Sequence, residues 1–228
     1  MLSSDQTHHL HRLIRLKAGD SCLLVDPLGA EGEARIERFL ESGQTLLKLI
    51  DKQPRKVSGK RLFLSAYVAL PQRGKGDELV EKGQELGLDE IHFLETERTV
   101  VKMTGANKGK AFLRWQKIAE ESAKQSGAFP FIHITPPLPL REALSALSGE
   151  QAVLFHPDPA ALPFSQWAPA LTPGSKLNFF IGPEGGFSPK ELALFKAAGR
   201  PVLRLGDSTL KTETAFLGIV SSLRFLYP

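Results

Sequence analysis

The feature that most limits how this chain can fold is a regular alternation of apolar and amphipathic segments, which begins at residue 61. Apolar runs typical of buried strands cover residues 61–70, 90–95, 131–134, 152–155, 176–181 and 202–206. Segments with the helical spacing of apolar residues cover 77–87, 110–127, 140–147, 188–199 and 212–226. This alternation predicts an α/β fold, with a mostly parallel sheet covered by helices on both faces.

Several of these helical segments carry end signals. Asp77 stands where its side chain can cap the first helix. Ser188, Pro189 and Glu191 predict a capping box with proline at the first helical position. Glycine marks the expected helix ends, at Gly87, Gly127 and Gly199.

Residues 1–57 have a different pattern, with short β-like runs. Strands are predicted at 23–26, 33–39 and 45–50, and in the second of them Ala34, Ile36 and Arg38 fall on one face. Residues 51–60 are polar and basic and contain proline and glycine, which is typical of a linker. The sequence therefore predicts two domains, a small β domain at 1–57 and an α/β domain at 61–228.

The composition is that of an ordinary globular protein. The chain has 228 residues, 42% of them hydrophobic, and a formal net charge of +4, which is compatible with nucleic-acid binding without requiring it. A single cysteine, Cys22, excludes an internal disulfide and favours a reducing compartment. The first residues lack the apolar run of a secretory signal, and residues 62–70 are too few to span a bilayer. We expect a soluble cytoplasmic protein that does not bind a membrane.

Three loops are the candidates for a ligand site, because ligands of open α/β sheets bind at the carboxyl ends of the strands. They are FHPDP (155–159), GPEGGFS (182–188) and GDSTLKTET (206–214). In the second loop, glycines allow the backbone to approach a ligand closely, and their N–H groups next to a helix start can form a donor-rich concavity. A tight turn with a surface Glu184 is the simpler alternative for that loop.

Neither common phosphate-binding motif is present. The chain lacks the Walker pattern G-x-x-x-x-G-K-[ST] and the dinucleotide pattern G-x-G-x-x-G. These absences weigh against a nucleotide-dependent hydrolase or kinase.

The third loop carries more charge and more hydroxyls than a connection requires. Thr212 or Asp207 is expected to cap the helix that follows. Capping does not explain Lys211, because the helix dipole disfavours a cation near a helix N-terminus. A cation in this position suggests a role in stabilising an anion.

At this point the chain resembles a known family. IGPEGGFSPKEL (181–192) and LGDSTLKTETA (205–215) are similar to motifs of the small-subunit ribosomal RNA methyltransferase E family. HHLHRLIRLKAGD (8–20), GDELVEKGQELGLDEIHFLETERTV (76–100) and RWQKIAEESAKQSG (114–127) match in the same order, so the resemblance covers almost the whole chain. It implies a PUA-like β-barrel followed by a SPOUT-type α/β domain with a C-terminal trefoil knot. It also implies a homodimer that uses S-adenosylmethionine to methylate N3 of one uridine in 16S rRNA of the 30S subunit.

The resemblance implies a cofactor site in the three loops. The expected cofactor-binding residues are Leu154, Phe155, His156, Ile181, Gly182, Pro183, Glu184, Gly185, Leu205, Gly206, Ser208, Leu210 and Thr214. Backbone groups of the glycine loop are expected near the adenosine or methionine, and Leu205, Gly206 and Leu210 around the adenine.

Catalysis at uridine N3 requires loss of a weakly acidic proton and stabilisation of the resulting anion. Lys211 is the candidate for stabilising the anion. Glu213 or Glu184 is the candidate base, if burial raises its pKa toward neutral. The family usually has arginine where this chain has Lys211, and again where it has Ala128.

Candidate RNA contacts lie in both domains. They are His9, Arg12, Arg15, Arg98, Lys102, Gln125 and Ser126. Residues 104–110 (TGANKGK) are expected to form a flexible loop that contacts phosphate, with plain solvation of its lysines as the alternative. The His8–His9 pair lacks the neighbouring Cys or carboxylate spacing of a metal site, so no metal is expected.

Two alternatives stay open beside the methyltransferase. One is a non-catalytic RNA-binding protein on a SPOUT scaffold, which the Lys211 and Ala128 departures favour. The other is methylation of a different RNA.

Overall fold

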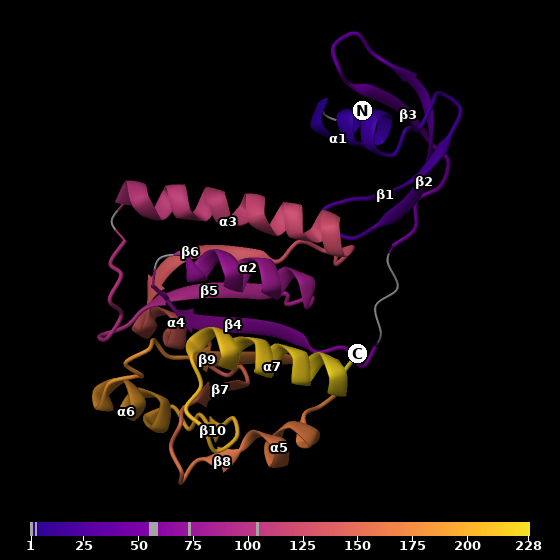
Figure 1. Cartoon of the computed structure of the whole chain (residues 1–228). Helices are drawn as coiled ribbons and strands as arrows, with labels where there is room; N and C mark the ends of the chain where they lie inside the picture. Colours follow the sequence, from indigo (N-terminus) through magenta and orange to yellow (C-terminus); the bar gives the residue numbers. More distant parts are fainter. Residues whose placement is uncertain (1, 3, 55–58, 73, 104) are drawn as a thin grey trace. The chain divides into compact units, whose positions relative to one another are not determined.

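The computed structural model describes residues 2, 4–54, 59–72, 74–103 and 105–228, except for the side chains of Asp5, His9 and Leu13. The chain forms two compact units, Met1–Lys56 and Val57–Pro228, and Figure 1 shows the elements of each. The boundary between the units falls at residues 55–58, outside the described residues.

The N-terminal unit has a three-stranded antiparallel sheet in the order β1-β2-β3. Its strands are β1 (Ser21–Val25), β2 (Glu31–Phe39) and β3 (Thr45–Leu49), so all three predicted strands are confirmed. Residues 4–13 are helical, as α1 (Ser4–His8) and η1 (His9–Leu13). The expectation of β structure throughout this unit is therefore wrong for its first segment.

Strand β2 alternates as predicted over only part of its length. Ala34 and Ile36 are buried, whereas Arg38 is exposed. The register with β3 shifts between Ile36 and Arg38. Such an irregularity turns the next side chain away from the buried face of the strand. The prediction that all three residues share one face is therefore wrong for Arg38.

The second unit is built on a seven-stranded sheet in the order β6-β5-β4-β9-β7-β10-β8. The strands are β4 (Phe63–Ala69), β5 (Glu90–Glu95), β6 (His133–Pro139), β7 (Ala152–Phe155), β8 (Leu162–Pro163), β9 (Lys176–Ile181) and β10 (Val202–Arg204). Every neighbouring pair is parallel. The predicted parallel α/β fold is confirmed.

Helices cover both faces of this sheet (Figure 1). The helical elements are α2 (Lys75–Glu85), α3 (Gly105–Ser126), α4 (Leu140–Ala146), α5 (Phe164–Trp167), η2 (Ala168–Ala170), α6 (Pro189–Ala197) and α7 (Thr212–Leu226). Val80 of α2, Trp115 of α3 and Phe216 of α7 belong to the apolar core on one face. Ala143 of α4 and Phe195 of α6 belong to the core on the other face.

Helix α2 begins earlier than its sequence signal suggests. It starts at Lys75 with Gly74 at the N-cap, so the prediction that Asp77 caps it is wrong. Asp77 Oδ1 instead accepts a hydrogen bond from the indole Nε1 of Trp115 at 3.1 Å, and Asp77 also pairs with Arg114. These contacts join α2 to α3.

Helix α3 also begins early. It starts at Gly105, so residues 105–110 form helical turns and the prediction of a flexible loop there is wrong; residue 104 lies outside the described residues. Lys108 Nζ lies 2.7 Å from Glu95 Oε1 and donates to the carbonyl oxygen of Pro137 at 3.3 Å. These contacts at the ends of β5 and β6 offset the low helix propensity of the glycines.

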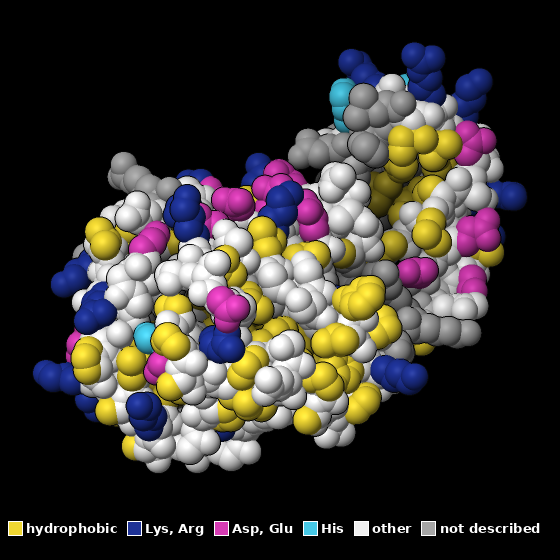
Figure 2. All heavy atoms as spheres, turned by 60° about the horizontal axis from the view of Figure 1, so that its bottom comes forward, with side chains coloured by type: hydrophobic (Ala, Val, Ile, Leu, Met, Phe, Trp, Pro, Cys, Tyr) yellow, Lys and Arg dark blue, Asp and Glu magenta, His cyan; other side chains and the backbone are white. Residues whose placement is uncertain are grey.

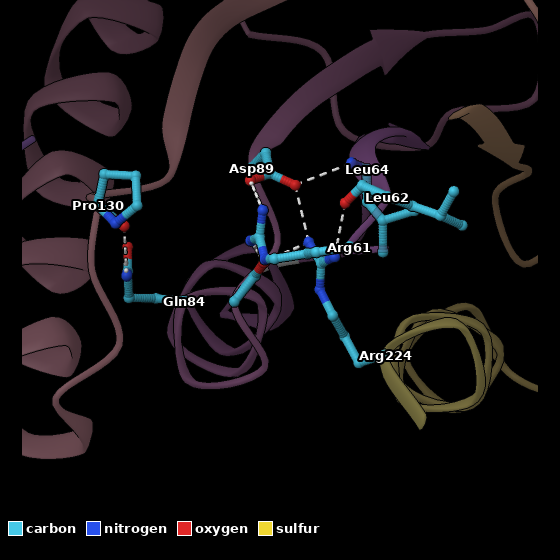
Figure 3. Close-up of polar contacts among 8 residues, drawn as sticks. Arg61, Leu62, Leu64, Gln84, Asp89, Pro130 and Arg224 are labelled. Atoms are coloured by element: carbon cyan, nitrogen blue, oxygen red, sulfur yellow. Dashed lines mark hydrogen bonds and ion pairs between the residues drawn. The ribbon is translucent and has the colours of Figure 1, made fainter. Parts of the chain in front are cut away.

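A half-buried cluster of one aspartate and two arginines ties the end of α7 to the start of β4 (Figure 3). Asp89 accepts hydrogen bonds from Arg61 Nη1 and Arg224 Nη2, both at 2.7 Å, and from the backbone N–H of Leu64 at 2.8 Å. Both guanidinium groups also donate to the carbonyl oxygen of Gly87. Desolvation lowers the pKa of Arg224, and the nearby Arg61 charge lowers it further, so Asp89 compensates two cations at once.

The surface of the α/β unit carries mixed charge. On the face in Figure 2, lysine and arginine side chains are dispersed among acidic and apolar ones. No helix within the described ranges is both long and apolar enough to cross a membrane. The same residues contain no cluster of three His, Cys, Asp or Glu side chains that could hold a metal ion.

Candidate functional site

The three predicted ligand loops meet in one cavity of about 530 Å³, at the carboxyl ends of β7, β9 and β10. Phe155 of β7 pairs with Ile181 of β9 and with Leu203 of β10, so the three loops leave the sheet at the same level. The predicted site residues that line the cavity are Phe155, His156, Ile181, Gly182, Pro183, Glu184, Leu205, Gly206, Ser208, Leu210 and Lys211.

Four predicted site residues do not line this cavity. Leu154 is buried in the sheet core beside Phe180, because side chains alternate between the faces of a strand. Gly185 lies in the glycine loop, where its carbonyl oxygen accepts from Arg98 Nη1 at 2.8 Å. Thr214 is exposed in the first turn of α7, and Glu213 forms an ion pair described below.

The glycine loop is held close to the following helix. A Cβ atom on Gly182 would lie 3.1 Å from the ring of Phe187, and Gly186 has φ of 67°. The predicted capping box is confirmed, since Ser188 Oγ accepts from the N–H of Glu191 and Glu191 Oε2 accepts from the N–H of Ser188. Glycines therefore allow a close packing that larger residues would strain.

The loop before α7 is tied to the glycine loop. The hydroxyl of Thr212 donates to the carbonyl oxygen of Gly182 at 3.0 Å, and Asp207 pairs with Arg204. The N-cap residue of α7 is Lys211, which makes no side-chain cap hydrogen bond. The prediction that Thr212 or Asp207 caps this helix is therefore wrong, because the Thr212 side chain bonds to the glycine loop and the Asp207 side chain pairs with Arg204 three residues earlier.

Lys75, at the start of α2, connects two acidic side chains of the site. Its Nζ atom lies 3.0 Å from Glu213 Oε1 and 3.6 Å from Glu184 Oε1. The hydrogen bond to Glu213 is the main reason that the pKa of Lys75 is raised. Three segments far apart in sequence thus meet in one ion-pair cluster beside the cavity.

Glu213 does not have the raised pKa that a neutral-pH base needs. Desolvation raises its pKa, but a backbone hydrogen bond and the charges of Lys75 and Lys211 together outweigh desolvation and leave the pKa lowered. The carboxylate therefore stays ionised at neutral pH and acts as the partner of Lys75.

Sequence reasoning missed several residues of the site. Lys75 could not be predicted as a site residue, because nothing in the sequence indicates that it lies beside Glu213. Other lining residues outside the predicted set are Pro157, Asp158, Pro159, Gly186, Phe187, Arg204, Asp207, Thr209, Thr212 and Ala215. Most of them lie within the three predicted loops, so their position in those loops could have identified them as lining residues.

The predicted RNA contacts are spread over both units. Arg12 and Arg15 of the N-terminal unit are exposed, and the side chain of His9 lies outside what the structure describes. In the α/β unit, Arg98 reaches the glycine loop and Lys102 is exposed. Gln125 is exposed at the end of α3.

Ser126 has a local structural role. Its hydroxyl donates to the carbonyl oxygen of Ser122 and accepts from the N–H of Ala128. The carbonyl oxygen of Ala128 in turn accepts from Nε2 of the buried Gln84 at 2.5 Å. These contacts end α3 and join the chain after it to α2.

Comparison with known proteins identifies the family of this chain. A family model described as an RNA methyltransferase domain matches residues 59–224. The chain belongs to this family of RNA methyltransferases. The resemblance to the small-subunit ribosomal RNA methyltransferase E family is also confirmed: the ribosomal RNA small subunit methyltransferase E of Synechocystis is 28% identical over 221 residues, which are 94% of this chain and 69% of that protein.

Solved structures share the fold of this RNA methyltransferase. A Legionella pneumophila protein described as a methyltransferase, in complex with the bound cofactor SAM, is 25% identical with a TM-score of 0.80, covering 98% of this chain and 90% of its own. The ribosomal RNA small subunit methyltransferase E of Neisseria gonorrhoeae, bound to S-adenosyl methionine, is 24% identical with a TM-score of 0.82, covering 99% and 91%.

Proposed function

We propose that this RNA methyltransferase transfers a methyl group from S-adenosylmethionine to N3 of one uridine of 16S rRNA, U1498, in the 30S subunit. The observation that carries the proposal is the convergence of three loops on one cavity whose lining includes Lys211 and Glu184. Membership of the RNA methyltransferase family and the similarity to methyltransferase E proteins support it.

The cavity fits S-adenosylmethionine. Its volume of about 530 Å³ is within the range of small-molecule sites. Gly182 lines the cavity and packs so closely on Phe187, another lining residue, that a Cβ atom there would crowd the ring and change the shape of this wall. Ile181, Leu205 and Leu210 offer apolar surface for the adenine, and backbone groups of the glycine loop offer polar contacts. When bound, the sulfonium supplies an activated methyl group.

The chain's own residues provide the remaining chemistry. The N3–H bond of uridine must break as the N3–carbon bond forms, and the proton needs an acceptor. We assign acceptance of this proton to the Glu184 carboxylate, which lines the cavity. The ammonium of Lys211 offsets the negative charge that develops on the uracil ring. Lys75 fixes the position of Glu184 and keeps Glu213 ionised.

The proposal extends to the architecture. We assign residues 61–228 to a SPOUT-type domain with a C-terminal trefoil knot, supported by the hydrogen bond from Thr212 to Gly182 that joins two distant loops. We assign residues 1–57 to a PUA-like β-barrel that binds RNA, supported by its antiparallel sheet and its exposed Arg12 and Arg15. A homodimer would cover apolar surface such as Phe225 of α7, which is 86% exposed.

The test is methyl transfer from radiolabelled S-adenosylmethionine to 30S subunits from a strain that lacks this gene, with the product nucleoside identified by mass spectrometry. Wild-type protein is expected to form 3-methyluridine. Lys211→Ala is expected to lose about a hundredfold in rate. Lys196→Ala, an exposed lysine of α6 outside the cavity, is the matched control and should keep full activity.

The outcomes separate the alternatives. A different methylated nucleoside would indicate another target base, and transfer only to other RNA would indicate another substrate. Cofactor binding without transfer to any RNA would favour a non-catalytic RNA-binding protein. A Lys211→Ala variant with wild-type activity would remove Lys211 from the mechanism and leave the enzyme.

A further inference from the structure

A second cavity, of about 310 Å³, lies beside the site described above. It is enclosed by the segment after β4, the segment after β5 and the first turns of α3. Its apolar wall includes Val101, Met103 and Trp115, and its polar groups include Gln72, Asn107 and Lys110.

The two cavities share the same edge of the sheet. β4 and β9 are paired in parallel, with Val68 beside Ile181, so the chain segments that follow them start side by side. The segment after β9 lines the first cavity, and the segment after β4 lines the second.

Lys75 stands between the cavities. Its neighbours Gly74 and Gly76 line the second cavity, whereas its ammonium pairs with Glu184, which lines the first. The Lys75 ion-pair cluster therefore lies between the two cavities.

The wall of the second cavity is held rigidly. The ring of Trp115 packs on Phe93 at a centroid distance of 4.2 Å, and its indole N–H is bound to Asp77. A Cβ atom on Gly76 would lie 3.2 Å from the Trp115 ring, so the backbone of α2 rests against the indole. A fixed aromatic and apolar wall suits a flat base.

The polar groups of the cavity suit a nucleotide. Gln72 and Asn107 are exposed, and their side-chain amides form no hydrogen bond within the part of the chain that the structure describes, so the side-chain N–H groups are available to carbonyl oxygens. Lys110 provides positive charge for phosphate, whereas the charge of Arg114 is compensated by its ion pair with Asp77, which also lines the cavity. Uracil presents two carbonyl oxygens on either side of N3, and donors to both would leave N3 free.

We propose that the second cavity holds the target uracil nucleotide, turned out of the folded RNA, with N3 directed toward the first cavity. This inference rests on the proposed function and adds the acceptor site to it. Gln72 and Asn107 hold the ring carbonyls, Lys110 holds the phosphate, and the Lys75 cluster lies where the two substrates meet.

The test fills the second cavity and leaves the first unchanged. Ala111 lines the second cavity and becomes leucine; Ala106, exposed on the same helix and outside both cavities, becomes leucine as the matched control. Cofactor affinity is measured by calorimetry, and kcat and KM are measured with 30S subunits. We expect Ala111→Leu to bind S-adenosylmethionine within twofold of wild type and to lose at least tenfold in kcat/KM, while Ala106→Leu matches wild type.

A second variant tests the inference even if Ala111→Leu fails to fold. Asn107→Ala removes an exposed amide and should raise KM for 30S subunits at least threefold, with cofactor affinity unchanged. If both variants transfer methyl groups as wild type does, the acceptor-site inference is overturned and the proposed function stands. If wild-type protein transfers no methyl group, both are overturned. Equal loss of cofactor affinity and transfer in Ala111→Leu would also contradict a separate acceptor site.

Discussion

The ammonium of Lys75 lies 3.0 Å from the carboxylate of Glu213, and it bridges from there to Glu184 at 3.6 Å. This pairing joins the start of α2 to the start of α7 and to the glycine loop. We expect Lys75→Ala to reduce methyl transfer about tenfold, because Glu184 loses the contact that positions it. Lys82→Ala is the matched control, since Lys82 also pairs with two glutamates, Glu81 and Glu85, which lie on the same helix. Equal activity of the two variants would contradict a positioning role for Lys75.

The same pair has a defined pH dependence. The pKa of Glu213 is lowered from its ordinary value of 4.5, so its contribution to stability is present above 4.5 and is lost as pH falls through the folded-state value. The pKa of Lys75 is raised above 10.5, so its contribution is present below 10.5 and is lost as pH rises through the folded-state value. The Tm difference between wild type and Lys75→Ala should be constant from pH 5 to pH 10, within those limits, and should shrink in stronger acid.

Gly182→Ala is expected to weaken binding of S-adenosylmethionine about fivefold or more, because the new methyl group would crowd the buried Phe187. Calorimetric titration with the cofactor measures the effect. Gly109→Ala is the control, since a Cβ atom there meets nothing within 4 Å on helix α3. The control should bind the cofactor normally and gain up to about 1 kcal/mol of stability from better helix propensity.

Asp89→Asn should destabilise the α/β unit by about 3 kcal/mol, because Arg61 and Arg224 would then share a largely buried region without a carboxylate. Chemical denaturation monitored by circular dichroism measures the change. Asp158→Asn is the comparison, because the half-buried Asp158 side chain accepts a hydrogen bond from the N–H of Ala160 within its own turn and an asparagine oxygen can also accept it. A loss below about 0.5 kcal/mol for Asp89→Asn would show that water replaces the carboxylate at little cost.

Glu90 should make the α/β unit sensitive to acid. Its pKa is lowered to about 2, first through the hydrogen bond with His92 and further through the charge of Lys176. The contribution of Glu90 is therefore present above its ordinary value of 4.5 and is lost as pH falls toward 2. Glu90→Gln should cost at most about 2 kcal/mol at pH 7 and almost nothing at pH 2, measured as unfolding free energy.

Local sequence signals predicted much of the α/β unit. The strands at 90–95, 152–155 and 176–181 and the helix at 212–226 have the predicted bounds, because buried strands and amphipathic helices differ in hydrophobic period. The three ligand loops were found for a topological reason, since the carboxyl ends of parallel strands share one edge.

The failures come from contacts between segments that are distant in sequence. Asp77 is a residue type that often caps helices, but its carboxylate instead binds Trp115 and Arg114. Only the packing of α2 on α3 brings these two partners to it. Thr212 likewise bonds to Gly182 across two loops. Residues 105–110 have weak helix propensity, and the pairing of Lys108 with Glu95 overrides it.

The pairing of β4 with β9 in the middle of the sheet has a consequence for folding. The two strands are separated by about 110 residues of sequence, and β4 receives its other neighbour, β5, from the segment that directly follows it. One edge of β4 therefore stays open until β9 is synthesised and docks. Such long-range pairing slows folding and leaves an apolar edge of β4 unpaired while the rest of the chain is synthesised. We expect this protein to need protection from aggregation during synthesis more than a helical protein of equal size.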